Sequence, residues 1–320
     1  MASPLVSIVI PVYNRPALIR DAVDSALDEG KRVPLEVIVV DDCSTDETWD
    51  VVRGYGGVVR AVRLERNSGQ SVARNHGLDL ASAKYVKFLD SDDVLAEGHL
   101  ELEVERAESD GADIVVSGWG ARFDDGTTRV WPAPHFQSVI DDVLAGLAVP
   151  TSSALYRKGA CARWDPALRK LDDWDVFCQS ALGAAAIVAV EGSAYWMREH
   201  GGARATGVSM LTNAREHHAI LDKIERRLAA MGELTEARRK RLAQYYYKEM
   251  RVFALYDRPA FEEAMRHIVA LDPRFRPVDE ERQAWMRAAA RVLGPRQAIL
   301  VHTRIKTLLR RLRARSPRTE

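Results

Sequence analysis

The sequence predicts an α/β fold, with a mostly parallel β-sheet flanked by helices and a helical appendage at its C-terminal end. Two observations lead to this prediction. Short apolar, β-branched runs alternate with segments of helical periodicity through the first third of the chain. From about residue 209 onward the pattern is helical and rich in charge. A repeated strand–helix–strand order favours parallel strands, right-handed crossovers and helices on both faces of the sheet.

The first strand is expected at residues 5–13, because LVSIVIPVY is a nearly continuous apolar run, as in a strand that is buried on both faces. Pro16 then opens a helix, since proline is favoured at the first helical position. The apolar residues of this helix fall on one face: Leu18, Ala22, Val23, Ala26 and Leu27. A second buried strand is expected at residues 35–40 and leads into Asp41 and Asp42.

The same order continues along the chain. Ser44 and Glu47 have the spacing of a capping box, which predicts that a helix begins there. A strand at 58–64, a helix at 70–82 and a strand at 85–89 follow. These elements are succeeded by a helix at 97–109 and a strand at 113–117.

After Gly120 the pattern changes. Asp-Asp-Gly at 124–126 indicates a hairpin turn, and a short helix is expected near 138–147. Strand-like sequence at 154–157 and 187–196 flanks a helix that begins near Asp173. We therefore expect one domain at 1–208, with halves at 1–118 and 119–208, and a helical region at 209–320. In that region Tyr245, Tyr246, Tyr247 and Trp285 are the expected packing residues.

Composition narrows the class of protein. The chain has 320 residues, 47% hydrophobic and 29% charged, as in a globular protein rather than a disordered one. Its longest apolar stretch, 181–190, is too short for a membrane span, and its first residues lack the basic region of a signal peptide. Three cysteines without a CxxC pair favour a reducing compartment. We therefore expect a cytoplasmic protein.

Polar side chains follow several of the predicted strands at the point where each strand ends. In an open parallel sheet, ligands bind beyond these carboxyl ends. The loops concerned are Pro11-Val12-Tyr13-Asn14, Asp41 to Asp46, Asn67 to Ser71 and Asp90-Ser91-Asp92-Asp93. So many carboxylates at one edge repel one another unless a cation or sugar hydroxyls offset their charge. The sequence therefore predicts a ligand site at this edge.

These motifs, in this order, resemble those of family 2 glycosyltransferases, which are inverting enzymes with the GT-A nucleotide-sugar-binding fold. The resemblance runs from about residue 5 to residue 200. It rests on the two acidic loops, on Asn67 to Leu78, on Leu171-Asp172-Asp173-Trp174-Asp175 and on Arg198-Glu199-His200. It implies that residues 1–118 bind the nucleotide sugar and that residues 119–208 face the acceptor.

The resemblance and the residue chemistry agree on the donor side. A nucleotide needs an aromatic face and hydrogen-bond acceptors, which Tyr13 and Asp42 can supply, and Arg74 can reach the base or ribose. Packing alone is the alternative role for Tyr13. The expected donor-binding residues are Pro11, Val12, Tyr13, Asn14, Asp41, Asp42, Asn67, Gly69, Arg74, Asp90, Ser91, Asp92 and Arg198.

A diphosphate leaving group is best neutralised by Mg²⁺ or Mn²⁺, which takes one or two carboxylates plus phosphate oxygens. By analogy with the family, Asp92 is the direct ligand and His200 a second, although a structural role for His200 is equally compatible with the sequence. Asp173 is the expected catalytic base for the acceptor hydroxyl. The family motif usually reads Glu-Asp, so Asp172 is the alternative base.

The resemblance implies an inverting, metal-dependent transfer of a sugar, most simply from a UDP-sugar, to a saccharide or lipid-linked acceptor. The Gln-x-x-Arg-Trp motif of processive members is missing, which favours single additions. The motifs of dehydrogenases and P-loop NTPases are also missing. The rival hypothesis is a catalytically silent relative that binds nucleotide sugars or acts as a scaffold.

The last 25 residues differ from the rest in charge. Residues 296–320 carry eight Lys or Arg and one Glu, whereas the whole chain has a net charge of 0. Their apolar positions Ile305, Leu308, Leu309 and Leu312 have helical spacing. A basic amphipathic helix of this kind can lie on an anionic membrane surface, and the alternative is a helix that packs on the body of the protein or on a partner subunit. No nucleic-acid partner is expected.

Overall fold

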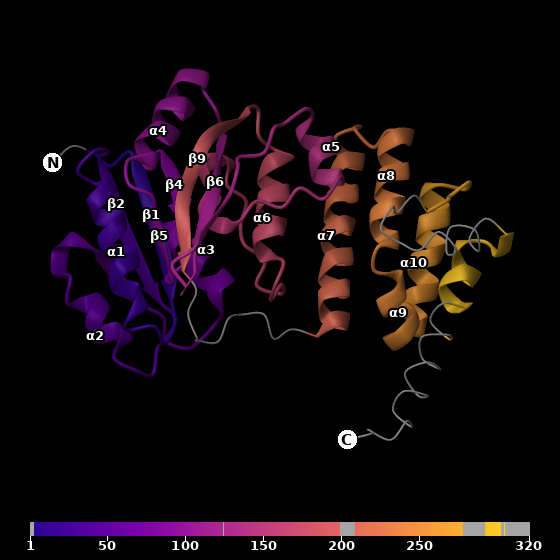
Figure 1. Cartoon of the computed structure of the whole chain (residues 1–320), viewed down its shortest axis with the longest axis horizontal. Helices are drawn as coiled ribbons and strands as arrows, with labels where there is room; N and C mark the ends of the chain where they lie inside the picture. The colour runs from indigo at the N-terminus through magenta and orange to yellow at the C-terminus, as the bar shows by residue number, and fades with distance from the viewer. Residues whose placement is uncertain (1–2, 124, 199–208, 278–291, 302–303, 305–320) are drawn as a thin grey trace. The chain divides into compact units, whose positions relative to one another are not determined.

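The computed structural model describes residues 3–123, 125–198, 209–277, 292–301 and 304 (Figure 1). The chain divides into two compact units. The first comprises Met1–Val143 and Leu147–Thr206, and the second comprises Leu144–Gly146 and Gly207–Glu320. Each unit is described by itself.

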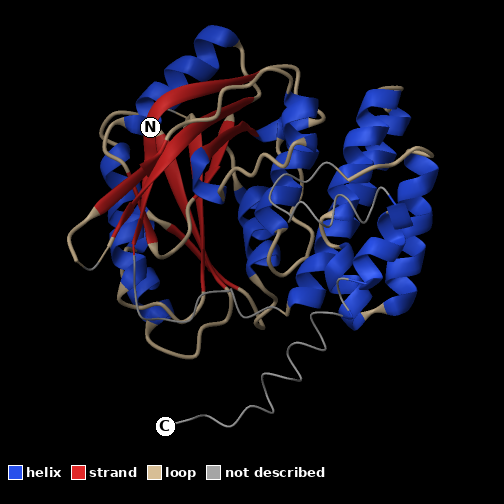
Figure 2. Cartoon of the chain, turned by 45° about the vertical axis from the view of Figure 1, so that its right-hand side comes forward, coloured by secondary structure: helices blue, strands red, loops and turns tan. Residues whose placement is uncertain are grey.

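The first unit is built on one sheet, drawn in red in Figure 2. Its strands are β1 (Val6–Val12), β2 (Leu35–Asp41), β3 (Arg60–Arg63), β4 (Tyr85–Phe88), β5 (Asp93–Leu95), β6 (Ile114–Arg122), β7 (Thr128–Trp131), β8 (Ala154–Arg157) and β9 (Ile187–Arg198). They lie in the order β3-β2-β1-β4-β8-β6-β9-β5, with β7 paired to β6. The expected hairpin at 124–126 is the connection between β6 and β7.

Most of these strands run in one direction. β1 to β4 are mutually parallel, and β6 and β9 are parallel to each other. β8 is antiparallel to both β4 and β6, so β6 has the same direction as β4. β5 and β7 are antiparallel to their neighbours. The predicted α/β class with a mostly parallel sheet is therefore confirmed.

Helices lie on both faces of the sheet (Figures 1 and 2). The helices of this part of the chain are α1 (Leu18–Glu29), α2 (Thr48–Arg53), α3 (Gln70–Leu80), α4 (His99–Asp110), α5 (Val139–Leu144) and α6 (Asp172–Ala181), and the last residue of α5 belongs to the second unit. Ile8 and Ile10 share a buried cluster with residues of α1 and α4, whereas Val9 points to the opposite face. A Cβ on Gly77 of α3 would lie 2.3 Å from Val9 Cγ1, so this glycine permits the close approach of α3 to β1.

Two local expectations are corrected. The capping box at Ser44 and Glu47 is wrong: α2 begins at Thr48 without a side-chain cap, because the Ser44 side chain bonds Asp41 and Asn14 instead. The segment after Asp92 contains a strand, β5, that its sequence did not predict. β5 is only three residues long, too short for a periodic pattern to be recognised.

The second unit is helical, as predicted. Its helices include α7 (Met210–Ala230), α8 (Glu236–Tyr247), α9 (Met250–Tyr256) and α10 (Arg258–Leu271), and residues 295–301 are also helical. Ser209 and Thr235 cap α7 and α8 by accepting backbone N–H bonds. Tyr245, Tyr246 and Tyr247 are buried, as expected of packing residues. Trp285 and the basic amphipathic segment at 305–320 lie outside the described residues.

The described helices include none that is both long and apolar enough to span a membrane.

Candidate active site

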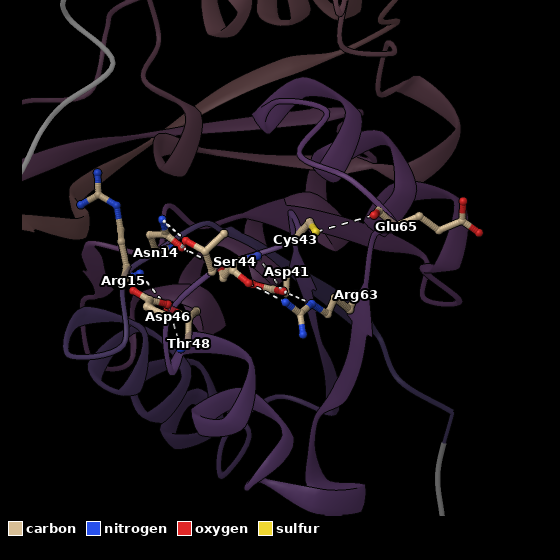
Figure 3. Close-up of polar contacts among 10 residues, drawn as sticks. Asn14, Arg15, Asp41, Cys43, Ser44, Asp46, Thr48, Arg63 and Glu65 are labelled. Carbon is tan, nitrogen blue, oxygen red and sulfur yellow. Dashed lines mark hydrogen bonds and ion pairs between the residues drawn. The ribbon is translucent and has the colours of Figure 1, made fainter.

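The loops that follow β1 and β2 are joined by hydrogen bonds (Figure 3). Asn14 adopts a left-handed backbone conformation, with φ 51°, which asparagine tolerates better than most residues. Its N–H donates to Ser44 Oγ at 3.0 Å, and its Oδ1 accepts the Thr45 N–H at 2.8 Å. Of the other predicted donor-binding residues here, Pro11 and Val12 are buried in β1, and Tyr13 is 40% exposed.

Asp41 is buried at the end of β2, and its carboxylate bonds to other residues of the protein (Figure 3). It accepts the Ser44 N–H at 3.1 Å and the Ser44 hydroxyl, and it pairs with Arg63 Nε at 3.1 Å. These contacts fix the loop that carries Asp42. Asp41 therefore stabilises the conformation of this loop.

Asp42 connects the β2 loop to the loop before α3. Its two carboxylate oxygens accept the backbone N–H groups of Ser68 and Gly69, each at 2.7 Å. Gly69 has φ 92°, a conformation that a side chain would strain. Asn67, also predicted to bind the donor, is exposed in the same loop. Hydrogen bonds therefore connect three of the predicted loops, those after β1 and β2 and the one before α3, into one surface.

Arg74 of α3 connects the acidic loop after β4 to the start of α6. Its side chain is 3% exposed, with Nη2 2.6 Å from Asp90 Oδ1 and Nη1 3.0 Å from Asp172 Oδ2. Its guanidinium carbon also lies 4.3 Å from the ring centroid of Trp164. Burial disfavours its charge, but Asp90 and Asp172 raise the pKa of Arg74 above its ordinary value. The guanidinium thus positions two acidic segments and is not exposed toward a base or ribose.

Asp172 is held on several sides. The same Oδ2 atom also accepts Gln70 Nε2 at 2.9 Å and Ser71 Oγ at 3.0 Å. Both donors lie at the start of α3. Because these contacts and the bond from Arg74 all converge on Oδ2 of Asp172, this side chain joins the start of α6 to the start of α3.

Asp92 and Arg198 meet on the other side of the acidic loop. Asp92 Oδ2 pairs with Arg15 Nη1 at 2.9 Å, and Arg198 Nε donates to the Asp92 carbonyl at 2.8 Å. The remaining Arg198 nitrogens contact Asp21 and the Leu18 carbonyl of α1. Arg198 therefore joins the acidic loop to α1, and each of its nitrogens already has a protein partner.

The residues between and after these aspartates are enclosed. Ser91 and Asp93 are both buried. Burial raises the pKa of the Asp93 carboxyl, and the neighbouring charges of Asp90 and Asp92 raise it further. Neutral Asp93 thus reduces the repulsion within the acidic loop.

Asp173 is adjacent to Asp172 but differs from it in its contacts. Its Oδ1 accepts the Trp174 N–H at 2.7 Å, and no other hydrogen bond to its carboxylate occurs among the described residues. Burial, followed by the charge of Asp172, raises the pKa of Asp173 to about 6. A carboxylate with a spare oxygen and a pKa near the working pH is suited to accept a proton.

The structure thus brings most of the predicted residues to one edge of the sheet. His200 lies outside the described residues. Sequence reasoning missed Arg15 and Trp164, and it did not predict that Ser71, which lies in one of the expected polar loops, bonds Asp172. Arg15 directly follows the polar loop after β1, so its position could have indicated its role. Nothing in the local sequence marks Trp164 as a partner of this site.

The acidic loop fits a divalent cation that also binds substrate. Asp90 and Asp92 are 37% and 22% exposed, so their carboxylates are accessible. The described part of the chain contains no group of three metal-ligating side chains. Mg²⁺ and Mn²⁺ are often held by one or two carboxylates plus substrate phosphates, and Asp90 and Asp92 are carboxylates of this kind. In this structure Asp90 pairs with Arg74 and Asp92 pairs with Arg15.

The first unit is similar in sequence to known proteins. Residues 7–163 match the family model described as glycosyl transferase family 2. TuaG of Bacillus subtilis, named as a teichuronic acid biosynthesis glycosyltransferase, is 41% identical over 127 residues, which are 39% of this chain and 50% of TuaG. The poly(ribitol-phosphate) β-N-acetylglucosaminyltransferase TarP of Staphylococcus aureus is 36% identical over 41% of each chain.

The succinoglycan biosynthesis protein ExoO of Rhizobium meliloti is 32% identical over 61% of this chain and 62% of its own. The chain thus spans about half the length of these curated relatives.

Solved structures resemble the chain over more of its length. TarS residues 1–349 of S. aureus, in complex with UDP-GlcNAc, superimpose with a TM-score of 0.69 at 21% identity, covering 94% of this chain and 92% of that one. A mannosyltransferase of Pyrobaculum calidifontis, in complex with GDP-Man and Mn²⁺, gives a TM-score of 0.52 at 18% identity, covering 96% and 88%. At these identities the similarity shows the fold alone, and it confirms the expected GT-A-type architecture.

Proposed function

Because residues 7–163 belong to glycosyl transferase family 2, we propose that this chain transfers a sugar from a UDP-sugar to an acceptor hydroxyl, one residue at a time and with inversion at the anomeric carbon. The acceptor is a saccharide or a lipid-linked glycan. TarP and TuaG carry names that refer to glycan synthesis, which supports this class of reaction.

The donor site is the surface formed by the connected loops. Tyr13 offers an exposed ring for the base, and Asn14, Asn67 and Gly69 lie on loops that Asp41 and Asp42 hold in place. Asp90 lies at the end of β4, where its partly exposed carboxylate can accept ribose hydroxyls. The UDP-GlcNAc complex of TarS, which has the same fold, is the reason for preferring a UDP-sugar.

The single observation that carries the catalytic assignment is the environment of Asp173. Its carboxylate is enclosed, has an oxygen without a described partner and has a pKa of about 6. At neutral pH it is therefore mostly ionised and can take the proton of the acceptor hydroxyl as the hydroxyl oxygen attacks. Asp172, Arg74 and Asp90 connect the start of α6 to the acidic loop, which restricts the position of Asp173, the residue next to Asp172.

Asp92, together with His200, would hold Mn²⁺ or Mg²⁺. A bound divalent cation supplies charge neutralisation to the leaving diphosphate. Arg15 pairs with Asp92 in this structure, and its guanidinium would bind diphosphate oxygens beside a cation held by Asp92.

The proposed partners follow from the same chemistry. A cytoplasmic enzyme with a basic C-terminal segment can reach a lipid-linked acceptor at the inner face of the membrane, or can associate with another copy of itself.

Release of UDP tests the proposal. The protein is incubated with individual UDP-sugars and Mn²⁺, and UDP release is compared between wild type and Asp173→Asn. We expect release to water by the wild type and its loss in the variant. If UDP-sugars bind, as judged by thermal shift, and neither protein releases UDP, the chain is the catalytically silent relative instead.

A further inference from the structure

In the part of the sheet formed by β6, β7 and β9, a tryptophan ring lies over a glycine. Gly120 of β6 lies opposite Trp196 of β9 on one side and Val130 of β7 on the other. A Cβ at position 120 would lie 2.4 Å from the Trp196 ring, so the absence of a side chain allows this ring to lie over the strand. The indole is thus seated in a space that a larger residue would fill.

Arg122 rests on this indole. Its guanidinium carbon is 4.6 Å from the Trp196 ring centroid, and its side chain is exposed. Within the described chain, its guanidinium has neither an ion pair nor a hydrogen bond. Most arginines near the acidic loop are different in this respect, since Arg15, Arg74 and Arg198 all contact carboxylates. Arg122 therefore keeps its charge and its hydrogen-bond donors for another partner.

The position of Arg122 relates it to the proposed active site. It is in register with Arg198 of β9, and Arg198 Nε donates to the Asp92 carbonyl. On the next strand, Asp93 of β5 is in register with Met197 of β9. Since neighbouring strands are about 4.8 Å apart, the backbone of Arg122 lies about 10 Å from that of Asp92. One sugar residue and an attached charged group can bridge such a distance.

We propose that Arg122, supported by Trp196 over Gly120, forms a subsite for a carboxylate or phosphate group carried by a substrate. The inference rests on the proposed glycosyl transfer, and it specifies an anionic substrate. A planar guanidinium binds such groups with two parallel hydrogen bonds. Stacking on the indole fixes the plane of the guanidinium, so fewer conformations are lost when the anion binds.

The anion can belong to the donor or to the acceptor. A uronic acid attached to UDP carries a carboxylate next to the ring, and a phosphate-containing acceptor carries its charge beyond the reacting hydroxyl. The two sources share one chemistry and are separated by two arms of the experiment.

Arg129 provides a matched control. It belongs to the same hairpin, is also exposed, and lies 4.8 Å from the ring centroid of Trp131. Its partner in the register is Ala121, so it projects from the face opposite to that of Arg122. Arg122→Gln and Arg129→Gln each remove one positive charge that lies over a tryptophan ring, but from opposite faces of the sheet.

The experiment measures dissociation constants by isothermal titration for wild type, Arg122→Gln, Arg122→Lys and Arg129→Gln. The donor arm compares UDP-glucuronate with UDP-glucose. The acceptor arm, with UDP and Mn²⁺ present, compares glycerol 3-phosphate with glycerol. UDP itself is titrated first in every variant, because failure to bind UDP would refute the proposed function rather than the anion subsite.

In either the donor arm or the acceptor arm, we expect wild type and Arg129→Gln to bind the anionic probe about tenfold more tightly than the neutral one. The arm that shows this preference identifies the substrate that carries the anion. Arg122→Gln should abolish this preference, and Arg122→Lys should retain only part of it. UDP affinity should be the same in all four proteins. The inference is overturned if wild type shows no preference in either arm, or if both glutamine variants lose the preference equally.

Discussion

Arg74 and Asp172 lie 98 positions apart in the sequence, and their side chains are joined at 3.0 Å in the interior of the first unit. The same guanidinium reaches Asp90 at 2.6 Å, so a single buried cation joins the acidic loop after β4 to the first turn of α6. The orientation of Asp173, the next residue, depends on this connection. Arg74 is therefore a positioning residue for the proposed catalytic base.

Replacing Arg74 by Met should lower both stability and activity. The change leaves Asp90 and the buried Asp172 without their cation, and breaking a buried pair from one side typically costs about 3–5 kcal/mol. Thermal unfolding should show a clear fall in Tm. Arg74→Lys keeps the charge but not the fork that spans both carboxylates, so it should recover part of the Tm and little of the turnover. A fully active Arg74→Lys enzyme would contradict the positioning role.

The rate of transfer should depend on the ionisation of Asp173. Because a base must be deprotonated to act, and because its pKa is raised to about 6, kcat/KM should fall about tenfold per pH unit below that value and level off above about pH 7. Initial rates of UDP release between pH 5 and pH 8 measure this profile. If kcat/KM does not change with pH over the same range, a group other than Asp173 accepts the proton of the acceptor hydroxyl.

The raised pKa of Asp173 also has a consequence for stability. The folded state binds the Asp173 proton more tightly than the unfolded state, so the contribution of this group falls as the pH rises through about 6. At pH 8 the Asp173→Asn protein should therefore have a Tm equal to or above that of wild type. Asp172→Asn should show the opposite, because it weakens three hydrogen bonds at a buried site. Measuring the Tm of each variant relative to wild type at pH 8 and at pH 5 shows whether each substitution raises or lowers stability as expected.

The second unit should lose stability in mild acid. Burial lowers the pKa of His217 to about 4 and that of His218 to about 3, so both are neutral when folded. Their unfolded forms gain protons below about pH 6.5, and the stability present above that pH is lost progressively as the pH falls toward 4. His267 acts in the opposite direction, since its bond to Glu225 raises its pKa. The Tm of the full chain should fall between pH 7 and pH 5, and by less in His218→Gln.

The sequence predicted the architecture and the edge of the sheet at which the polar loops gather, because strand and helix periodicity is local and the ends of parallel strands coincide. It did not predict how the side chains pair. Ser44 has the spacing of a helix cap, yet Asp41 and Asn14 compete successfully for its hydroxyl and the helix starts later. Asp42 was expected to bind a base, and its oxygens are used by the Ser68 and Gly69 amides. Such pairings join residues that are distant in sequence, where periodicity carries no information.

Removal of divalent cations tests the role of Asp92. We expect excess EDTA to abolish UDP release and added Mn²⁺ to restore it. Asp92→Asn should weaken Mn²⁺ binding in the presence of UDP by about tenfold or more, measured by titration calorimetry, while leaving Tm nearly unchanged because Asp92 is partly exposed. Unaltered turnover in EDTA would show that side chains such as Arg15 neutralise the diphosphate without a metal.

The central claim is that Asp173, and not its neighbour Asp172, takes the proton of the acceptor hydroxyl. The most direct measurement is the single-turnover rate of UDP release for wild type, Asp173→Asn and Asp172→Asn, with UDP-sugar affinity and Tm determined for each. Asp173→Asn should lose about 10²–10⁴ in rate with its donor affinity and Tm preserved, because loss of a general base affects the chemical step. Asp172→Asn should lose Tm, and its rate should fall less. If Asp173→Asn keeps its full rate while Asp172→Asn abolishes turnover at unchanged Tm, the catalytic base is Asp172 and the claim for Asp173 is contradicted.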